Sequence, residues 1–146
     1  MYRKILLPTN GSALCATAVT QGIGFAKSTG ASVVGFHAMP ATSYLIYTEA
    51  GPSDLLAEQF ERDARARGEK LMLAIAEESR LAGVPCSTHL AVNDHPWESV
   101  IATANQFSCD LIFMASHGRR GLSALLLGSE TARVLTHSKI PVLVYR

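Results

Sequence analysis

The sequence has almost no excess of charge of either sign. Among its 146 residues, 13 Lys and Arg stand against 12 Asp and Glu, which leaves a net charge of +1. Proteins that bind nucleic acid through a non-specific surface are usually strongly basic, and acidic disordered tails carry many uncompensated carboxylates. We therefore expect no nucleic-acid partner and no acidic tail.

Cysteine is also scarce, and its spacing does not suit a metal. Cys15, Cys86 and Cys109 are odd in number and include no CxxC pair, and no two of the five histidines lie within four residues of each other. Isolated cysteines of this kind are typical of reduced thiols in the core of a cytosolic protein. We expect a cytoplasmic protein without a structural metal site.

No segment has the length of a membrane span. From Ile5 to Thr48 the one charged residue is Lys27, but residues 8–12 interrupt the stretch with polar and turn-forming side chains. A span needs about 20 predominantly apolar residues, and a signal peptide needs about seven in a row. Low charge in this region therefore indicates burial, and we expect no association with a membrane.

Several familiar functional motifs are missing. The sequence contains no GxxxxGK[ST], GxSxG or HExxH pattern. Gly22 and Gly24 are followed by Lys27 where the dinucleotide-binding fingerprint needs a third glycine, and they fall inside a predicted helix. The sequence thus has no P-loop, no dinucleotide fingerprint, and no α/β-hydrolase or zincin motif.

The chain does contain an alternation of short apolar runs and helical patterns. Runs that are continuously apolar suit central parallel strands, which are buried on both faces. Four such runs are Ile5–Leu7, Ser32–Phe36, Leu111–Met114 and Val142–Val144. A patchier run, Val84–Val92, predicts an edge strand.

Four helices are predicted between these runs, with starts near Ser12, Ser53, Asp94 or His95, and Gly128-Ser129. Gly30 is expected to end the first of them, and Gly83, which Pro85 follows, the second. Their apolar stripes are Ala16, Val19, Ile23 and Ala26; Leu55, Leu56, Phe60, Ala64, Leu71, Met72 and Ile75; Val100, Ile101, Ala104 and Phe107; and Ala132, Val134 and Leu135. Alternating strands and helices predict one α/β domain over residues 1–146, with a parallel sheet covered on both faces. Such sheets bind ligands at the carboxyl ends of their strands, so we expect the site in the loops after the first and fourth strands.

The most informative stretch, residues 115–129, leads from the fourth predicted strand into the fourth helix. Its glycines let the backbone approach a ligand closely, and Arg119 and Arg120 add positive charge. Gly128 and Ser129 precede a helix whose free N–H groups and positive dipole end favour an anion. On these residues alone, a phosphate site and a glycine-rich turn with Ser129 as an ordinary N-cap are equally good interpretations.

The stretch resembles the ATP-binding motif of the universal stress protein family, G-x2-G-x9-G-[S/T], which falls here on Ala115, Gly118, Gly128 and Ser129. Residues 2–12, 94–96 and 138–144 also look like the family's opening strand, third helix start and closing strand. The resemblance implies a Rossmann-like, adenine nucleotide alpha hydrolase-like fold with five parallel strands in the order 3-2-1-4-5. It also implies a homodimer, for which the apolar segment Pro141–Tyr145 would pair across subunits.

Carried over residue by residue, the resemblance implies contacts with each part of an adenine nucleotide, accompanied by Mg²⁺ or Mn²⁺. These are Pro8, Thr9 and Asn10 beside the base and ribose, the backbone of Ala38 at the adenine edge, Met114 and Ala115 at the ribose, His117, Gly118 and Arg119 at the α- and β-phosphates, and Gly128, Ser129, Glu130 and Thr131 at the terminal phosphates. Two positions depart from the family pattern. Ala115 replaces a glycine, which is harmless only where φ is negative, and Asn10 replaces an acidic residue, so it offers a metal no charge.

The function that the resemblance implies is binding of ATP or AMP by a regulatory or stress-response module without rapid turnover. No catalytic residue is expected, because His117 beside phosphates is better suited to donate a hydrogen bond than to act as a base. Slow ATP hydrolysis is the most activity that we anticipate. Two alternatives stay open: a stress protein that binds no nucleotide and acts as a dimeric interaction partner, and an adenylating enzyme of the wider nucleotide alpha hydrolase class.

Overall fold

The computed structural model describes residues 1–41, 54–118 and 126–146. The expected phosphate ligand Arg119, its neighbour Arg120 and the predicted helix start at Ser53 lie outside the described residues. Strands and helices alternate along the chain as the sequence predicts. They are β1 Lys4–Pro8, α1 Ala13–Thr29, β2 Ser32–Met39, α2 Asp54–Ala82, β3 Cys86–Val92, α3 Pro96–Gln106, β4 Leu111–Ala115, α4 Ser129–His137 and β5 Val142–Tyr145.

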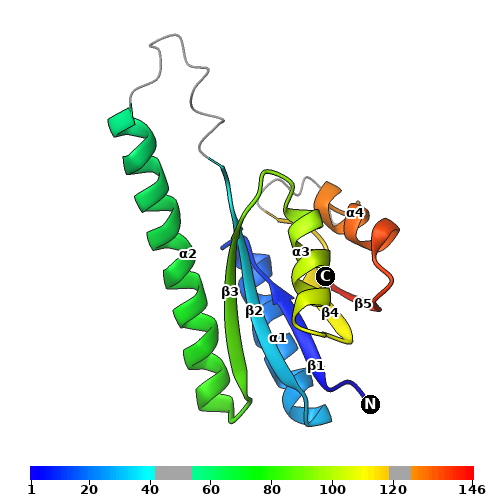
Figure 1. Cartoon of the computed structure of the whole chain (residues 1–146). Helices are drawn as coiled ribbons and strands as arrows, with labels where there is room; N and C mark the ends of the chain where they lie inside the picture. Colours follow the sequence, from blue (N-terminus) through cyan, green and yellow to red (C-terminus); the bar gives the residue numbers. More distant parts are fainter. Residues whose placement is uncertain (42–53, 119–125) are drawn as a thin grey trace.

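The five strands form one parallel sheet in the order β3-β2-β1-β4-β5. The predicted single α/β domain with strand order 3-2-1-4-5 is therefore confirmed, and β3 lies at an edge as expected (Figure 1). The central strand β1 is fully buried along its middle, with Ile5, Leu6 and Leu7 all at 0% exposure. Their continuous apolar runs arise because both faces of the sheet are covered.

Two cores lie on opposite faces of the sheet. On one face, Ile5 and Leu7 of β1 pack with residues of α1 and α2. On the other face, Leu6 packs with Val100 of α3 and Val134 of α4. Successive side chains of a strand point to opposite faces, so one short strand supplies both cores. Among the described residues, no helix is both long enough and apolar enough to span a bilayer.

Parts of the predicted helical stripes are wrong. Leu55 and Leu56 are 78% and 66% exposed, and Ala16 and Leu135 also lie on exposed faces. Helix α2 has 29 residues and reaches beyond the ends of the strands, so its first turns have no sheet beneath them (Figure 1). In the first turn of α1, the buried side chain is Cys15 rather than the predicted Ala16.

The helix ends match the prediction in α1 but not in α4. Ser12 caps α1 by accepting a hydrogen bond from the Cys15 amide, and Gly30 ends the helix at a φ of 69°. The prediction that Ser129 is an N-cap is wrong, because Gly128 occupies that position with φ −61° and ψ 152°. Gly128 cannot cap with a side chain, so the first amides of α4 receive no side-chain hydrogen bond from their own N-cap residue.

Hydrogen bonds to Asp110 hold the beginning of β1 beside the beginning of β4. Its carboxylate accepts hydrogen bonds from the backbone amides of Arg3, at 2.9 and 3.1 Å, and of Lys4, at 3.0 Å. Burial acts to raise the pKa of this carboxyl, but the amides of Lys4, Arg3 and Asp110 itself, with the charge of Arg3, hold the pKa below its ordinary value. The contact aligns the two central strands whose far ends lead into the expected site.

The three cysteines are unpaired thiols. Cys15 and Cys109 are buried and Cys86 is half-buried, so two of the three fit the expected core thiols. Burial raises the pKa of Cys109 to about 11, with a further contribution from Asp110 that opposes the lowering effect of Lys4. Cys109 therefore stays protonated and unreactive at neutral pH.

Replacing Ser79 with alanine should stabilise the protein slightly. Ser79 lies in α2 with 0% of its surface exposed, and its hydroxyl has no hydrogen-bond partner among the described residues. A buried hydroxyl without a partner carries an uncompensated desolvation cost, so its removal should raise the free energy of unfolding by about 1 kcal/mol. Urea denaturation would measure the change. A loss of stability instead would show that the hydroxyl has a partner, such as a buried water.

Candidate functional site

A cavity opens where the carboxyl ends of β1, β2 and β4 reach the same edge of the sheet. Helices α3 and α4 begin at this edge and supply the rest of its wall, because in a parallel sheet each connecting helix starts where the preceding strand ends. The lining residues are Pro8, Thr9, Asn10, Cys15, Phe36, His37, Ala38, Pro96, Trp97, Val100, Met114, Ala115, His117, Gly118, Glu130, Thr131 and Val134.

Most of the residues expected to contact a nucleotide lie around this cavity. They are Pro8, Thr9, Asn10, Ala38, Met114, Ala115, His117, Gly118, Glu130 and Thr131. Gly128 and Ser129 are described but are not among the lining residues, and Arg119 lies outside the described residues. The chain thus gathers at one place residues that are distant in the sequence, as expected for a site at the carboxyl edge.

Other lining residues were not anticipated from the sequence. Phe36 and His37 come from β2, Cys15 from α1, Val134 from α4, and Pro96, Trp97 and Val100 from α3. A usable signal existed for α3, since the proline at its first position marks a helix start, and helices of such folds start at the ligand-binding edge. The side chains of β2 carried no comparable signal.

The turn after β1 is held by hydrogen bonds to β2 and within itself. The Thr9 amide donates to the Phe36 carbonyl oxygen at 2.8 Å, and His37 Nδ1 donates to the Thr9 carbonyl oxygen at 2.8 Å. Asn10 Oδ1 accepts from the Ser12 amide at 3.0 Å, and Gly11 adopts a φ of 80°. The backbone beside the cavity is therefore fixed, with the Asn10 side chain tied to the start of α1.

The backbone of Ala38 presents a donor and an acceptor toward the cavity. The backbone carbonyl of Phe36 points toward β1, since it accepts a hydrogen bond from the Thr9 amide. The carbonyl of Met39 points toward β3, since it accepts from the Asn93 amide. Backbone N–H and C=O groups alternate in direction along a strand, so those of Ala38 point to the same side as those of Phe36. β1, however, has already ended at Pro8 and has no residue opposite them. The N–H and C=O of Ala38 consequently have no hydrogen-bond partner among the described residues.

The alanine at the first glycine position of the motif fits its place. Ala115 is the last residue of β4, is 4% exposed and pairs with Tyr145 of β5. Among the described residues, Ser108 is the one non-glycine residue with a positive φ. Ala115 therefore has a negative φ, and its methyl group causes no backbone strain. Its carbonyl oxygen accepts a hydrogen bond from the Thr131 hydroxyl at 2.9 Å.

Neighbouring loops approach the two remaining motif glycines closely. A Cβ on Gly118 would collide with Asn10 Nδ2, which joins the loop after β4 to the turn after β1. A Cβ on Gly128 would lie 3.0 Å from His117 Cα and 3.2 Å from His117 Cβ. The Gly128 amide donates to the Ser116 carbonyl oxygen at 2.8 Å, so this loop closes back on the start of α4.

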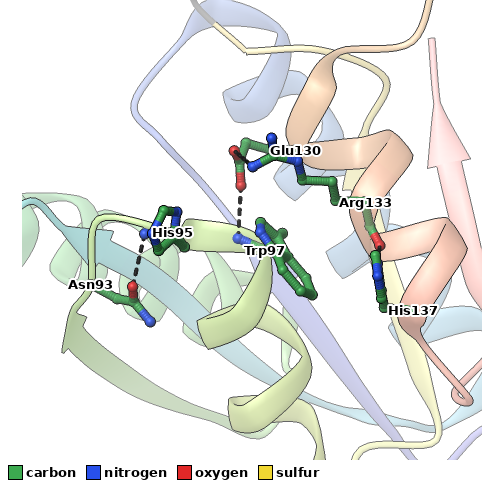
Figure 2. Close-up of polar contacts among 6 residues, drawn as sticks. All are labelled: Asn93, His95, Trp97, Glu130, Arg133 and His137. Atoms are coloured by element: carbon green, nitrogen blue, oxygen red, sulfur yellow. Dashed lines mark hydrogen bonds and ion pairs between the residues drawn. The ribbon is translucent and has the colours of Figure 1, made fainter.

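Glu130 links the starts of α3 and α4 (Figure 2). Its Oε2 accepts a hydrogen bond from the Trp97 amide at 2.8 Å, which caps α3 in place of His95, whose side chain makes no capping bond. Glu130 also forms a 3.9 Å ion pair with Arg133. The rings of Trp97 and His137 lie 4.5 Å apart between centroids. The cavity wall formed by Trp97 is thus held from α4 at two points.

A model of the universal stress protein family matches residues 1–146.

The chain belongs to the universal stress protein family.

A universal stress protein encoded beside the QAH/OAS sulfhydrylase gene of Thermus aquaticus is 30% identical over 146 residues, with 100% of both chains covered. The solved structure of MJ0577, named a universal stress protein of Methanocaldococcus jannaschii, superimposes with a TM-score of 0.82 at 26% identity and covers 99% of this chain and 95% of that one.

Three further structures of family members contain adenine nucleotides. They are a complex with cAMP, an Archaeoglobus fulgidus protein with dAMP and an Arabidopsis thaliana protein with AMP. They are 16–21% identical to this chain, cover 97–99% of it and 90–98% of their own lengths, and give TM-scores of 0.68–0.72. At this identity the likeness extends to the universal stress protein fold alone.

The described residues form no cluster of side chains typical of a metal site. Within residues 1–41, 54–118 and 126–146, no three His, Cys, Asp or Glu side chains come close enough together to bind an ion. Asn10, at the position where the family pattern has an acidic residue, is neutral and has its oxygen engaged by the Ser12 amide.

Proposed function

We propose that the cavity binds an adenine nucleotide and that this family member acts as a nucleotide-responsive regulatory or stress-response module without rapid turnover. The observation that carries the proposal is that the N–H and C=O of Ala38 lie at the cavity without a hydrogen-bond partner in the part of the chain that the structure describes. The edge of adenine offers N1 as an acceptor beside the N6 amino group as a donor. A backbone N–H and C=O on one residue match these two groups.

The walls of the cavity suit a planar base and a short phosphate chain. Phe36, Val100 and Met114 provide apolar surface, as ligand pockets usually do, with few polar groups to orient the ligand. Gly118 brings backbone without a side chain to the cavity, where a phosphate oxygen could accept from an amide. Membership of a family with solved cAMP, dAMP and AMP complexes supports the same ligand class.

Binding without rapid turnover agrees with the state of the histidine and glutamate side chains that line the cavity. His37 is hydrogen-bonded to the Thr9 carbonyl, His117 to the Ser116 hydroxyl, and Glu130 to the Trp97 amide. Each of these described side chains is engaged by the protein, and none forms a dyad with another that would activate a water. We therefore propose a sensor or carrier of nucleotide in the cytoplasm rather than an efficient hydrolase.

We also propose that the protein forms a homodimer through β5. Residues 142–145 are apolar or aromatic and half-buried, and β5 pairs with β4 on one side. An exposed apolar edge favours pairing with another strand. Such a pairing would extend the sheet across two subunits.

Calorimetric titration of the whole protein with AMP and with GMP tests the proposed nucleotide site. AMP is expected to bind at least about tenfold more tightly, because guanine sets a donor against the Ala38 N–H and an acceptor against its C=O. IMP should behave like GMP, because its base also has a donor at N1 and an acceptor at O6. Absence of heat and of a thermal shift with every adenine nucleotide at millimolar concentration would contradict the proposal and favour a protein that acts only as an interaction partner. Equal affinity for AMP and GMP would exclude base recognition by Ala38.

A further inference from the structure

A carboxylate lines the cavity where helices α3 and α4 begin. Glu130 lies in the first turn of α4 and lines the cavity. Its Oε2 is 2.8 Å from the Trp97 amide, so the same carboxylate also lies at the start of α3. Helix N-termini attract anions through their free amides and dipoles. Here the protein's own negative charge occupies that position at α3 and belongs to a residue in the first turn of α4.

Two donors near the start of α4 are committed to the protein. The Gly128 amide donates to the Ser116 carbonyl oxygen at 2.8 Å, and the Thr131 hydroxyl donates to the Ala115 carbonyl oxygen at 2.9 Å. Gly128 and Ser129 are not among the residues that line the cavity. A second or third phosphate there would meet the carboxylate of Glu130 and could use these two donors only by breaking their bonds to the protein.

The charge of Glu130 is only weakly neutralised by its ion pair. Arg133 Nη1 lies 3.9 Å from Glu130 Oε1, and the two side chains are 52% and 42% exposed. A long, solvated pair of this kind contributes little. The hydrogen bond from the Trp97 amide comes from a neutral donor, which orients the carboxylate without cancelling its charge (Figure 2).

We propose that Glu130 is a specificity-determining residue that selects nucleoside monophosphates over di- and triphosphates. This inference rests on the proposed nucleotide site and narrows its ligand class. A single phosphate attached to the ribose can remain near His117 and Gly118, whereas each added phosphate brings more negative charge toward Glu130. Repulsion between charges a few ångströms apart in a partly hydrated site corresponds to about a tenfold change in affinity.

The test compares AMP, ADP and ATP by calorimetry in buffer containing EDTA, with the wild-type protein and with Glu130→Gln. Glutamine keeps a carbonyl oxygen that can accept from the Trp97 amide, so the cap of α3 is retained while the charge is removed. Wild type should bind AMP about tenfold more tightly than ATP, with ADP between them. E130Q should raise the affinity for ATP about tenfold and change that for AMP by less than about threefold.

Glu98→Gln is the matched control, because Glu98 is an exposed glutamate in the first turn of α3 and does not line the cavity. It changes net charge equally and should leave the ratio of AMP to ATP affinity unaltered.

The wild-type ligand series is itself a test that needs no variant, and the difference between AMP and ATP affinity should shrink at high salt. Binding of ATP as tightly as AMP by wild type, or an unchanged ratio in E130Q that still binds AMP, would overturn the inference while leaving the nucleotide site standing. Failure of all three nucleotides to bind would overturn both.

Discussion

The substitution Ala38→Pro is expected to weaken the binding of AMP about 100-fold in a protein that still folds. The substitution removes the one backbone donor that the proposed site aims at adenine N1, and the proline ring occupies the space of the missing hydrogen. Because the Ala38 N–H has no hydrogen-bond partner among the described residues, no strand hydrogen bond to those residues is lost. The preceding residue, His37, lies within β2 in the extended conformation that a residue before proline prefers.

Calorimetry with AMP measures this loss, and circular dichroism with a melting curve shows that the variant retains the fold. Ala38→Gly is the appropriate control, because it alters the side chain but keeps both the N–H and the C=O, and it should bind AMP within a few-fold of wild type. A proline variant that melts cooperatively and binds AMP like wild type would exclude Ala38 as the group that reads the base. The adenine edge would then have to be recognised elsewhere in the cavity.

The core of this fold could be predicted because the strands are both short and buried on two sides. Ile5, Leu6 and Leu7 form an uninterrupted apolar run, and all three are fully buried. The glycines that follow the first and second helical patterns, Gly30 and Gly83, do occupy positive φ, which marks the helix ends from the sequence alone. The order of the strands, in contrast, came from family resemblance, since parallel β-α-β units by themselves allow several orders.

Helical periodicity predicted faces but not how far those faces are covered. Leu55 and Leu56 continue the apolar stripe of α2, yet they lie in turns that extend past the sheet and stay exposed. A stripe indicates which side of a helix is apolar, whereas burial depends on the length of the neighbouring elements. The cap of α4 was misassigned for a related reason, because Gly128 is positioned by its close contact with His117, which spacing does not reveal.

Partners of charged side chains were the least predictable part of the site. The position of Glu130 in the motif suggested a phosphate neighbour, but the structure gives its carboxylate the Trp97 amide, 33 positions away in the chain. Asp110 likewise serves the amides of Arg3 and Lys4 at the other end of the molecule. Such pairings depend on how the strands and helices are arranged in space, so no local pattern in the sequence reports them.

A valine at Gly22 is expected to destabilise the protein by about 3 kcal/mol, which lowers the melting temperature by roughly 10 °C in a chain of this size. Gly22 lies in α1 against the sheet, where an added Cβ would be 2.5 Å from Leu7 Cδ2 and 3.3 Å from Phe113 Cδ1. Leu7 and Phe113 are 0% and 5% exposed, so neither side chain has free space into which to move. The helix would have to lift from β1 and β4.

The same substitution at Gly24 separates packing from helix propensity. Gly24 lies two residues further along α1, is exposed, and would have nothing within 4 Å of an added Cβ. Gly24→Val should change the free energy of unfolding by no more than about 0.5 kcal/mol. Urea denaturation of both variants would measure the two changes. Equal effects at the two positions would mean that the close contact between α1 and the sheet is not required. A large effect at Gly22 alone should also weaken AMP binding, because Leu7 directly precedes Pro8 and Thr9, and a displaced β1 would move the turn that borders the cavity.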